Sequence, residues 1–255
     1  MSKTYKDIYN KGNLRMWVDL STYCNAACPQ CHRTNPDGLE KSRWLPLIQW
    51  SFEKFQEIFP KDMLWHYNIF DFCGTWGDPV MNKDLDKIID YIIENSTATI
   101  MLTTNGSIRD EGWWWDLGVK CGGRLNLVMD IDGIDQEMHS RYRQKTNLDT
   151  VINNLSTVSM TKANCKVFTV LFKHNEKYAY EIAKLAKASG AEKIFFVPSN
   201  RFNRKTSVYE FNIAGKEQTL EQTVIAQDHP MMWHDIKLDD ENLAKIKQMV
   251  DQLDD

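Results

Sequence analysis

The chain has 255 residues, 42% hydrophobic residues and a formal net charge of −4 at pH 7. This length and composition allow one sizeable core, and the negative charge argues against nucleic acid as a partner. No stretch approaches the ~18 uninterrupted apolar residues of a membrane-spanning helix, and residues 1–13 lack the apolar core of a signal peptide. The sequence therefore predicts a single-domain, soluble, cytoplasmic protein without a membrane partner.

Segments of strand and helix character alternate after a polar stretch at residues 1–14. Strands are expected at residues 15–21, 65–73, 97–103, 125–131, 166–172 and 193–197, and helices at 47–59, 84–95, 110–119, 148–160 and 176–188. Six strands alternating with helices are typical of a parallel sheet with right-handed crossovers. Residues 199–235 are polar and predicted to be irregular, and residues 238–253 have the pattern of a last helix.

Three of the six cysteines lie within eight positions, in the loop after the first expected strand. Cys24, Cys28 and Cys31 must stay close together, because a chain spans at most ~3.3–3.6 Å per residue. Three thiolates with no obvious fourth ligand are typical of an iron–sulfur cluster that keeps one iron open. His32 could complete a Cys3His zinc site, so zinc is the alternative metal.

Unusual residues also follow the later strands. In parallel α/β folds ligands gather at the carboxyl ends of the strands, because the loops there face one mouth. The residues at these ends include Trp76, Gly77 and Asp78 after the second strand, Thr104 and Asn105 after the third, Asp130 and Arg143 after the fourth, and Val197 at the sixth. We expect them to lie near the cysteine loop.

The spacing Cys-x3-Cys-x2-Cys resembles the signature of the radical SAM superfamily, and the strand-end motifs resemble those of its peptide-modifying SPASM-type and molybdenum-cofactor-type members. The resemblance implies a partial (β/α)6 TIM-like barrel over residues 15–200. Residues 1–14 would be a tail, and residues 201–255 a short C-terminal extension that covers the mouth or contacts substrate. No cysteine follows Cys165, so we expect the cysteine-rich C-terminal domain of those members to be absent or truncated here. Gln30 stands where many members have an aromatic residue.

The resemblance also implies the cofactors and the reaction. Cys24, Cys28 and Cys31 would hold one 4Fe–4S cluster, and the amino and carboxylate groups of S-adenosylmethionine (SAM) would chelate its fourth iron. An electron from an external donor of flavodoxin or ferredoxin type would cleave SAM to a 5′-deoxyadenosyl radical. The radical would abstract hydrogen from a peptide or small-molecule substrate.

SAM contacts are implied for the residues that match the family's loops. Trp76, Gly77 and Asp78 match a loop that grips the methionine ammonium group, and Thr104 and Asn105 match a motif beside the SAM pocket.

The later strand ends would complete the SAM site. Asp130 replaces a serine and would suit ribose hydroxyls, Arg143 would pair with the SAM carboxylate, and Val197 lies in a segment that would stack on adenine. Beyond it, Arg201, Arg204 and Lys205 could hold an anionic substrate or form a solvated loop. No side chain is assigned as catalytic.

Two other functions stay open at this stage. A compact chain of this type could be an activase that places a radical on a glycyl radical enzyme. It could instead be a zinc- or iron–sulfur-binding module without catalysis, which iron and zinc content would separate from the enzymes.

Overall fold

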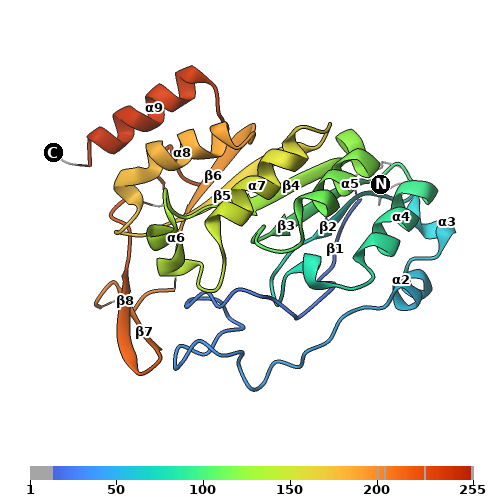
Figure 1. The fold of residues 1–255 in the computed structure, drawn as a ribbon, viewed down its shortest axis with the longest axis horizontal. Helices are drawn as coiled ribbons and strands as arrows, with labels where there is room; N and C mark the ends of the chain where they lie inside the picture. The colour runs from blue at the N-terminus through green and yellow to red at the C-terminus, as the bar shows by residue number, and fades with distance from the viewer. Residues whose placement is uncertain (1–13, 200, 204, 227, 254–255) are drawn as a thin grey trace, which may run out of the picture.

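The computed structural model describes residues 14–199, 201–203, 205–226 and 228–253. Its main sheet has seven strands in the order β1-β2-β3-β4-β5-β6-β9 (Figure 1). Six are parallel: β1 (Leu14–Trp17), β2 (Tyr67–Phe72), β3 (Thr99–Thr104), β4 (Leu125–Asp130), β5 (Asn164–Leu171) and β6 (Lys193–Pro198). The last strand, β9 (Asp235–Lys237), is antiparallel to β6. The sheet stays open between β1 and β9, which confirms a partial barrel.

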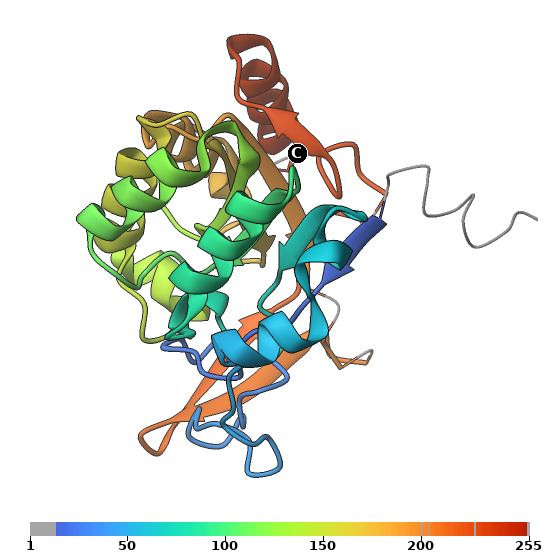
Figure 2. The same ribbon diagram turned by 90° about the vertical axis from the view of Figure 1, so that its right-hand side faces the viewer.

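Helices connect the strands and cover one face of the curved sheet (Figure 2). The α-helices are α2 (Phe52–Ile58), α3 (Lys61–Leu64), α4 (Leu85–Asn95), α5 (Glu111–Cys121), α6 (Gln136–Tyr142), α7 (Leu148–Ser159), α8 (Ala179–Ala188) and α9 (Asp240–Asp251). Short 3-10 helices are η1 (Pro79–Met81), η2 (Gly122–Arg124) and η3 (Glu176–Tyr178). None of the described helices is long and apolar enough to cross a membrane.

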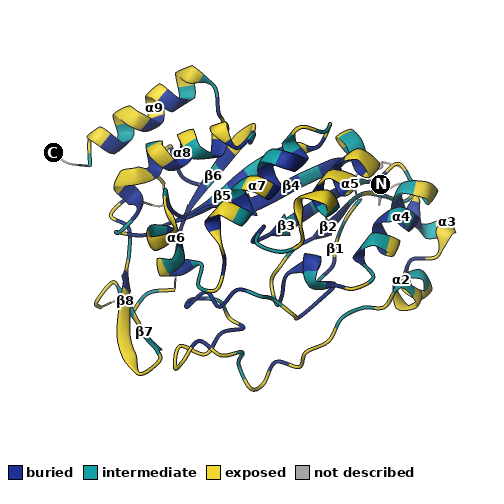
Figure 3. Cartoon of the chain, viewed as in Figure 1, coloured by how far each residue is buried: buried dark blue, intermediate teal, exposed yellow. Residues whose placement is uncertain are grey.

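The core lies between the sheet and these helices, whose inward faces are buried and whose outward faces are exposed (Figure 3). On α4, Ile88, Ile89 and Ile92 are fully buried, as a helical spacing of apolar residues predicts. The packed layers hold the strands in register, so the loops at the carboxyl ends of the strands are carried on a rigid support.

Two expected elements near the N-terminus are shorter than predicted. The first strand ends at Trp17, and the helix expected over 47–59 begins only after its N-cap Ser51. The chain before Ser51 is extended instead, because its backbone bonds to the cysteine loop: the N–H of Trp50 donates to the carbonyl of Leu20 at 3.0 Å. Helix α6 was not predicted as a separate element.

The prediction that residues 199–235 are irregular is wrong. They contain the antiparallel hairpin of β7 (Val208–Ile213) and β8 (Lys216–Glu221), and the start of β9. Ala214 and Gly215 join the hairpin strands, both with positive φ (49° and 79°). This is the conformation of a two-residue type I′ turn, which usually carries Asn-Gly.

The final predicted helix is confirmed as α9, and it packs on the barrel. Its apolar face contributes Leu243, Ile246 and Val250 to the main core, and β9 extends the sheet beside Ile194. The division of the chain at residues 14 and 200 remains a prediction, and residues 1–13 lie outside the described part.

Candidate active site

The cysteine loop runs from the end of β1 to α2 and is fixed by hydrogen bonds to its own ends. The hydroxyl of Thr22 donates to the carbonyl of Pro46 at 2.7 Å and accepts from the N–H of Ile48 at 2.8 Å. Within the loop, the N–H of Cys31 donates to the carbonyl of Cys28 at 3.0 Å. The backbone around the thiols is therefore ordered by the protein itself.

The chain after β2, the carboxyl ends of β3 to β6 and the cysteine loop line a hollow of about 480 Å³, here called the mouth. Its size lies in the range of small-molecule and cofactor pockets. The residues singled out in the sequence that line it include Cys28, Cys31, His32, Asp130, Arg143, Val197 and Arg201. Residues that the sequence did not point to also line it, including Tyr142, Phe168 and Val170.

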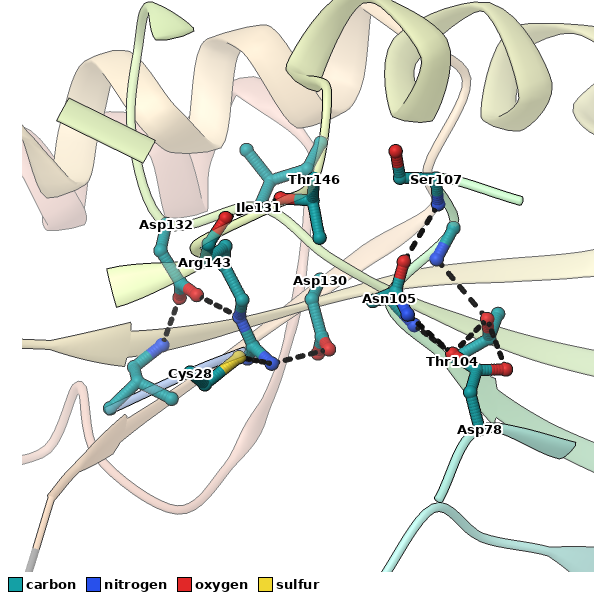
Figure 4. A network of polar contacts seen from close by, with 12 residues as sticks. Cys28, Asp78, Thr104, Asn105, Ser107, Asp130, Ile131, Asp132, Arg143 and Thr146 are labelled. Carbon is teal, nitrogen blue, oxygen red and sulfur yellow. Dashed lines mark hydrogen bonds and ion pairs between the residues drawn. The ribbon is translucent and has the colours of Figure 1, made fainter. Parts of the chain in front are cut away.

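Arg143 is the centre of a buried charge network at the mouth (Figure 4). Its Nη1 lies 2.8 Å from Oδ2 of Asp130 and 3.9 Å from Sγ of Cys28, and its Nε donates to Asp132. Asp132 belongs to the strand-end motif in the sequence but was assigned no role there; it is fully buried and also accepts from the N–H of Val170 at 2.6 Å. These contacts join the end of α6, the end of β4 and strand β5 beside Cys28.

Burial and charge act in opposite directions in this network. Burial raises the pKa of Asp130 to about 7, although Arg143 opposes the shift. Burial also raises the pKa of the Cys28 thiol to about 12, again against the nearby guanidinium. Burial disfavours the charged form of Arg143, but Asp130 and Asp132 hold its pKa well above the usual value. Arg143 is therefore the cation that balances the acidic groups around Cys28.

Asp78 forms a second network, on the side of the mouth nearer Cys24. Its carboxylate accepts from the hydroxyl of Thr104 at 2.8 Å and from the N–H of Asn105 at 3.0 Å (Figure 4). It also accepts from the N–H of Val80 at 2.9 Å. The side chain of Asn105 also donates to Asp78 at 2.6 Å, and its nitrogen lies 3.8 Å from Sγ of Cys24. The structure brings Asp78, Thr104 and Asn105 together, with the carboxylate turned toward these partners.

Gly77 lies against the backbone of the cysteine loop. A Cβ built on it would be 2.7 Å from Cα of Thr22 and closer still to the carbonyl oxygen of Ser21. Such distances are shorter than any real contact of a Cβ, so this position requires glycine. Its neighbour Trp76 packs edge-on against Trp44, with ring centroids 5.4 Å apart, and lies 6.0 Å from the ring of His32.

Gln30 ties the cysteine loop to the chain that follows β6. Its side chain accepts from the hydroxyl of Ser199 and donates to the carbonyl of Arg201 at 3.2 Å. The guanidinium of Arg201 donates in turn to the main-chain carbonyl of Gln30. Arg204 lies outside the described residues, and the exposed Lys205 does not line the mouth.

The thiols fit an iron–sulfur cluster by their chemistry. Cys24, Cys28 and Cys31 are free and belong to one apolar cluster of side chains, beside a hollow. Burial is the main reason that the pKa of the Cys24 thiol, like that of Cys28, is raised. Among the described residues, no three His, Cys, Asp or Glu side chains converge as ligands of a single metal ion.

No protein-family profile matches the chain. Among curated proteins, GTP 3′,8-cyclase of Synechocystis is 26% identical over 188 residues, which is 73% of this chain and 54% of that protein. GTP 3′,8-cyclase of Campylobacter jejuni (strain RM1221) is 27% identical over 155 residues, 60% of this chain and 45% of that protein. The chain spans about half the length of these relatives.

Solved structures share the fold at low sequence identity. SuiB of Streptococcus suis, bound to its precursor peptide SuiA, has a TM-score of 0.58 and 15% identity, over 74% of this chain and 40% of that one. The enzyme anSMEcpe with bound AdoMet, which is SAM, has a TM-score of 0.57 and 19% identity, over 72% and 49%. Together with the sequence relatives, they support the resemblance of this chain to the radical SAM superfamily, whose enzymes carry a 4Fe–4S cluster and bind SAM.

Proposed function

We propose that this chain is an enzyme that reductively cleaves SAM at a 4Fe–4S cluster held by Cys24, Cys28 and Cys31, and abstracts hydrogen from a peptide or small-molecule substrate. The observation that carries the proposal is the arrangement of these thiols: one ordered loop presents them beside the mouth, where Arg143 and Asp130 converge. When bound, the cluster and SAM would supply the radical chemistry.

The protein's own residues would bind SAM, orient it and exclude water. Trp76, Gly77 and Asp78 form the loop proposed to hold the methionine end of SAM, and Thr104 and Asn105 support that loop through Asp78.

On the other side of the mouth, Asp130 could accept from ribose hydroxyls, and its partner Arg143 could donate to the SAM carboxylate if it gives up part of its pairing with Asp130 or Asp132. Val197 and Phe168 give an apolar wall suited to adenine. The reducing electron would come from an external flavodoxin- or ferredoxin-type protein.

Two substrate classes follow from the relatives. The sequence relatives are named for a purine nucleotide, GTP, whereas SuiB is a structural neighbour bound to a peptide. The two arginines that line the mouth, Arg143 and Arg201, already bond to groups of the protein, which leaves little for a triphosphate among the described residues there. We therefore favour a peptide substrate.

Iron content tests the proposal most directly. Anaerobically purified protein should be brown and hold about four irons per chain. Cys24→Ala, Cys28→Ala and Cys31→Ala should each lose the iron. Cys165→Ala should keep it, because Cys165 is buried in the core away from the loop and serves as the matched control. One bound zinc and no iron would instead support the non-catalytic module.

Reduction of the loaded protein then tests catalysis. Slow release of 5′-deoxyadenosine from SAM is expected without any substrate. Deuterium transfer from labelled peptide and metabolite pools into 5′-deoxyadenosine would reveal the substrate class. A protein radical on a glycyl radical enzyme, with no transfer from either pool, would favour the activase alternative.

A further inference from the structure

A second hollow lies outside the mouth, between α6, the chain after β5 and the β7–β8 hairpin. We call it the hairpin groove; its volume is about 570 Å³. The hairpin extends below α6 in Figure 1, and residues of both α6 and β8 line the groove. The lining is polar and includes Glu137, Arg141, His174, Glu217, Thr219 and Glu221. None of these residues takes part in the networks around the cysteine loop.

The hairpin ladder determines which backbone groups of β8 face the groove. Ile213 and Lys216 flank the two-residue turn, so they form a hydrogen-bonded pair, and bonded and non-bonded pairs alternate from there. The main-chain groups of Glu217, Thr219 and Glu221 therefore point away from β7. The carbonyl of Glu221 accepts from the N–H of Lys173 at 3.0 Å, as this alternation requires.

Glu217 and Thr219 leave a short open edge in the groove. Within the described part of the chain, no hydrogen bond joins their outward main-chain groups to another residue. The opposite edge of the hairpin is partly covered, since the N–H of Asn212 donates to the carbonyl of Pro36 at 2.8 Å. An unpaired strand edge is a template for another extended chain, which binds through main-chain hydrogen bonds.

The charge of the groove favours one kind of peptide. Glu137, Glu217 and Glu221 form no ion pair with any described residue, and the cation Lys173 is paired with Glu176 at 2.8 Å. Arg141 is the other cation among the described lining residues. The groove is therefore net negative, which suits Lys or Arg side chains and disfavours phosphate groups.

We propose that the hairpin groove binds an extended, basic segment of a peptide, which adds to β8 as a further strand. The proposal rests on the proposed function, because the bound peptide would be the substrate that reacts at the mouth. Tyr142 lines the mouth and Gln144 lines the groove, so one short segment of chain separates the two hollows. A peptide held in the groove could present another part of itself to the mouth.

A fluorescein-labelled octapeptide of alternating valine and lysine is a suitable probe, with a valine–glutamate octapeptide as its acidic counterpart. Fluorescence anisotropy would measure binding to the full chain, with and without reconstituted iron. The basic peptide should bind at least about tenfold more tightly than the acidic one, and added salt should weaken it.

Thr219→Pro is the decisive variant. It removes an N–H that faces the groove and that the β7–β8 ladder does not use. Glu210→Pro is the matched control, because Glu210 is the direct cross-strand partner of Thr219 and its N–H faces the other edge. Thr219→Pro should weaken binding of the basic peptide about tenfold, the effect of losing a main-chain hydrogen bond. Glu210→Pro should leave it within about twofold.

Equal loss in both proline variants, or no binding of the basic peptide, would overturn the proposal. Circular dichroism would check that the variants fold. Should Thr219→Pro unfold, Glu217→Lys with Glu137→Lys tests the same groove, and this pair should reverse the preference toward the acidic peptide. Because binding is read without iron or SAM, a failure of the cluster assay and a failure of the groove are separate results.

Discussion

Arg143 and Asp130 form an ion pair at the mouth, with 2.8 Å between Nη1 and Oδ2, and about a tenth of each side chain exposed. The family members that this chain resembles carry serine at the position of Asp130. The carboxylate that pairs with Arg143 is therefore itself a departure from the family motif. The family role of Arg143, pairing with the SAM carboxylate, would here have to compete with two carboxylates of the chain itself.

Loss of Arg143 should destabilise the fold. Arg143→Ala would leave Asp130 and Asp132 buried without their cation, which typically costs about 3–5 kcal/mol. Arg143→Lys should recover part of the lost stability. An ammonium restores the positive charge, but it lacks the planar fork by which the guanidinium contacts both Asp130 and Asp132. Denaturant unfolding would measure both variants. An Arg143→Ala protein as stable as the wild type would show that the carboxylates are held by other groups.

Gly77→Ala should displace the cysteine loop. The added methyl would overlap the backbone of Ser21 and Thr22, and such overpacking typically costs about 1–3 kcal/mol. We expect reduced iron retention after anaerobic reconstitution. Gly123→Ala is the control, since a Cβ there has no neighbour closer than 3.9 Å. Normal iron retention in Gly77→Ala would mean that the loop can shift without harm.

Asp78→Ala should weaken SAM binding through the loop it holds together. The change removes the acceptor of Val80, Thr104 and Asn105, and unsatisfied buried donors cost on the order of 1–3 kcal/mol each. Isothermal titration of SAM into reconstituted protein would measure affinity, with the exposed Asp116→Ala as control. Unchanged affinity would remove Asp78 from the SAM site.

His139 should contribute a loss of stability as the pH falls from about 6.5 toward 4. Burial lowers the pKa of this ring to about 4, while Nδ1 accepts from the N–H of Asp132 and Nε2 lies 3.0 Å from the hydroxyl of Thr146. The unfolded chain therefore takes up a proton in this range that the folded chain refuses. His139→Asn should reduce the difference in unfolding free energy between about pH 7.5 and pH 5 by ~1–2 kcal/mol. An undiminished difference would assign the acid sensitivity to other groups.

Truncation before α9 should destabilise the barrel. Leu243, Ile246 and Val250 are buried in the main core, and a fully buried aliphatic side chain contributes roughly 1.5–3 kcal/mol. Ile246→Ala alone should cost about 2–4 kcal/mol, as measured by thermal or denaturant unfolding. A truncated chain with wild-type stability would show instead that α9 is a detachable cover.

The periodic parts of the fold could be predicted from the sequence. Helix α4 has apolar residues at helical spacing, and β4 is a nearly continuous apolar run, so both were expected close to their observed bounds. The sequence does not predict the β7–β8 hairpin, because few of its side chains are buried and its strands therefore lack a clear apolar pattern. In β8 just Leu220 is buried, and Ala-Gly replaces the usual turn residues.

The site could be predicted as a set of residues but not as a set of contacts. Strand-end position brought Cys28, Asp130 and Arg143 to one hollow, as expected. The sequence does not reveal that Arg143 pairs with Asp132, because that contact depends on how the turn after β4 folds back toward α6. Gln30 was noticed only as a departure from a motif, and its bonds to Ser199 and Arg201 depend on the tertiary fold.

The open sheet has a consequence for what can be processed. Since β1 and β9 are the two edges of the sheet and do not pair, the strands do not form a complete ring. If the mouth is the reactive centre, as proposed, a long polymer would not need a free end to reach it, because an internal stretch could enter from the side. A reaction at a residue far from either terminus of a larger polypeptide is therefore compatible with this architecture, and so is release of the product without unthreading.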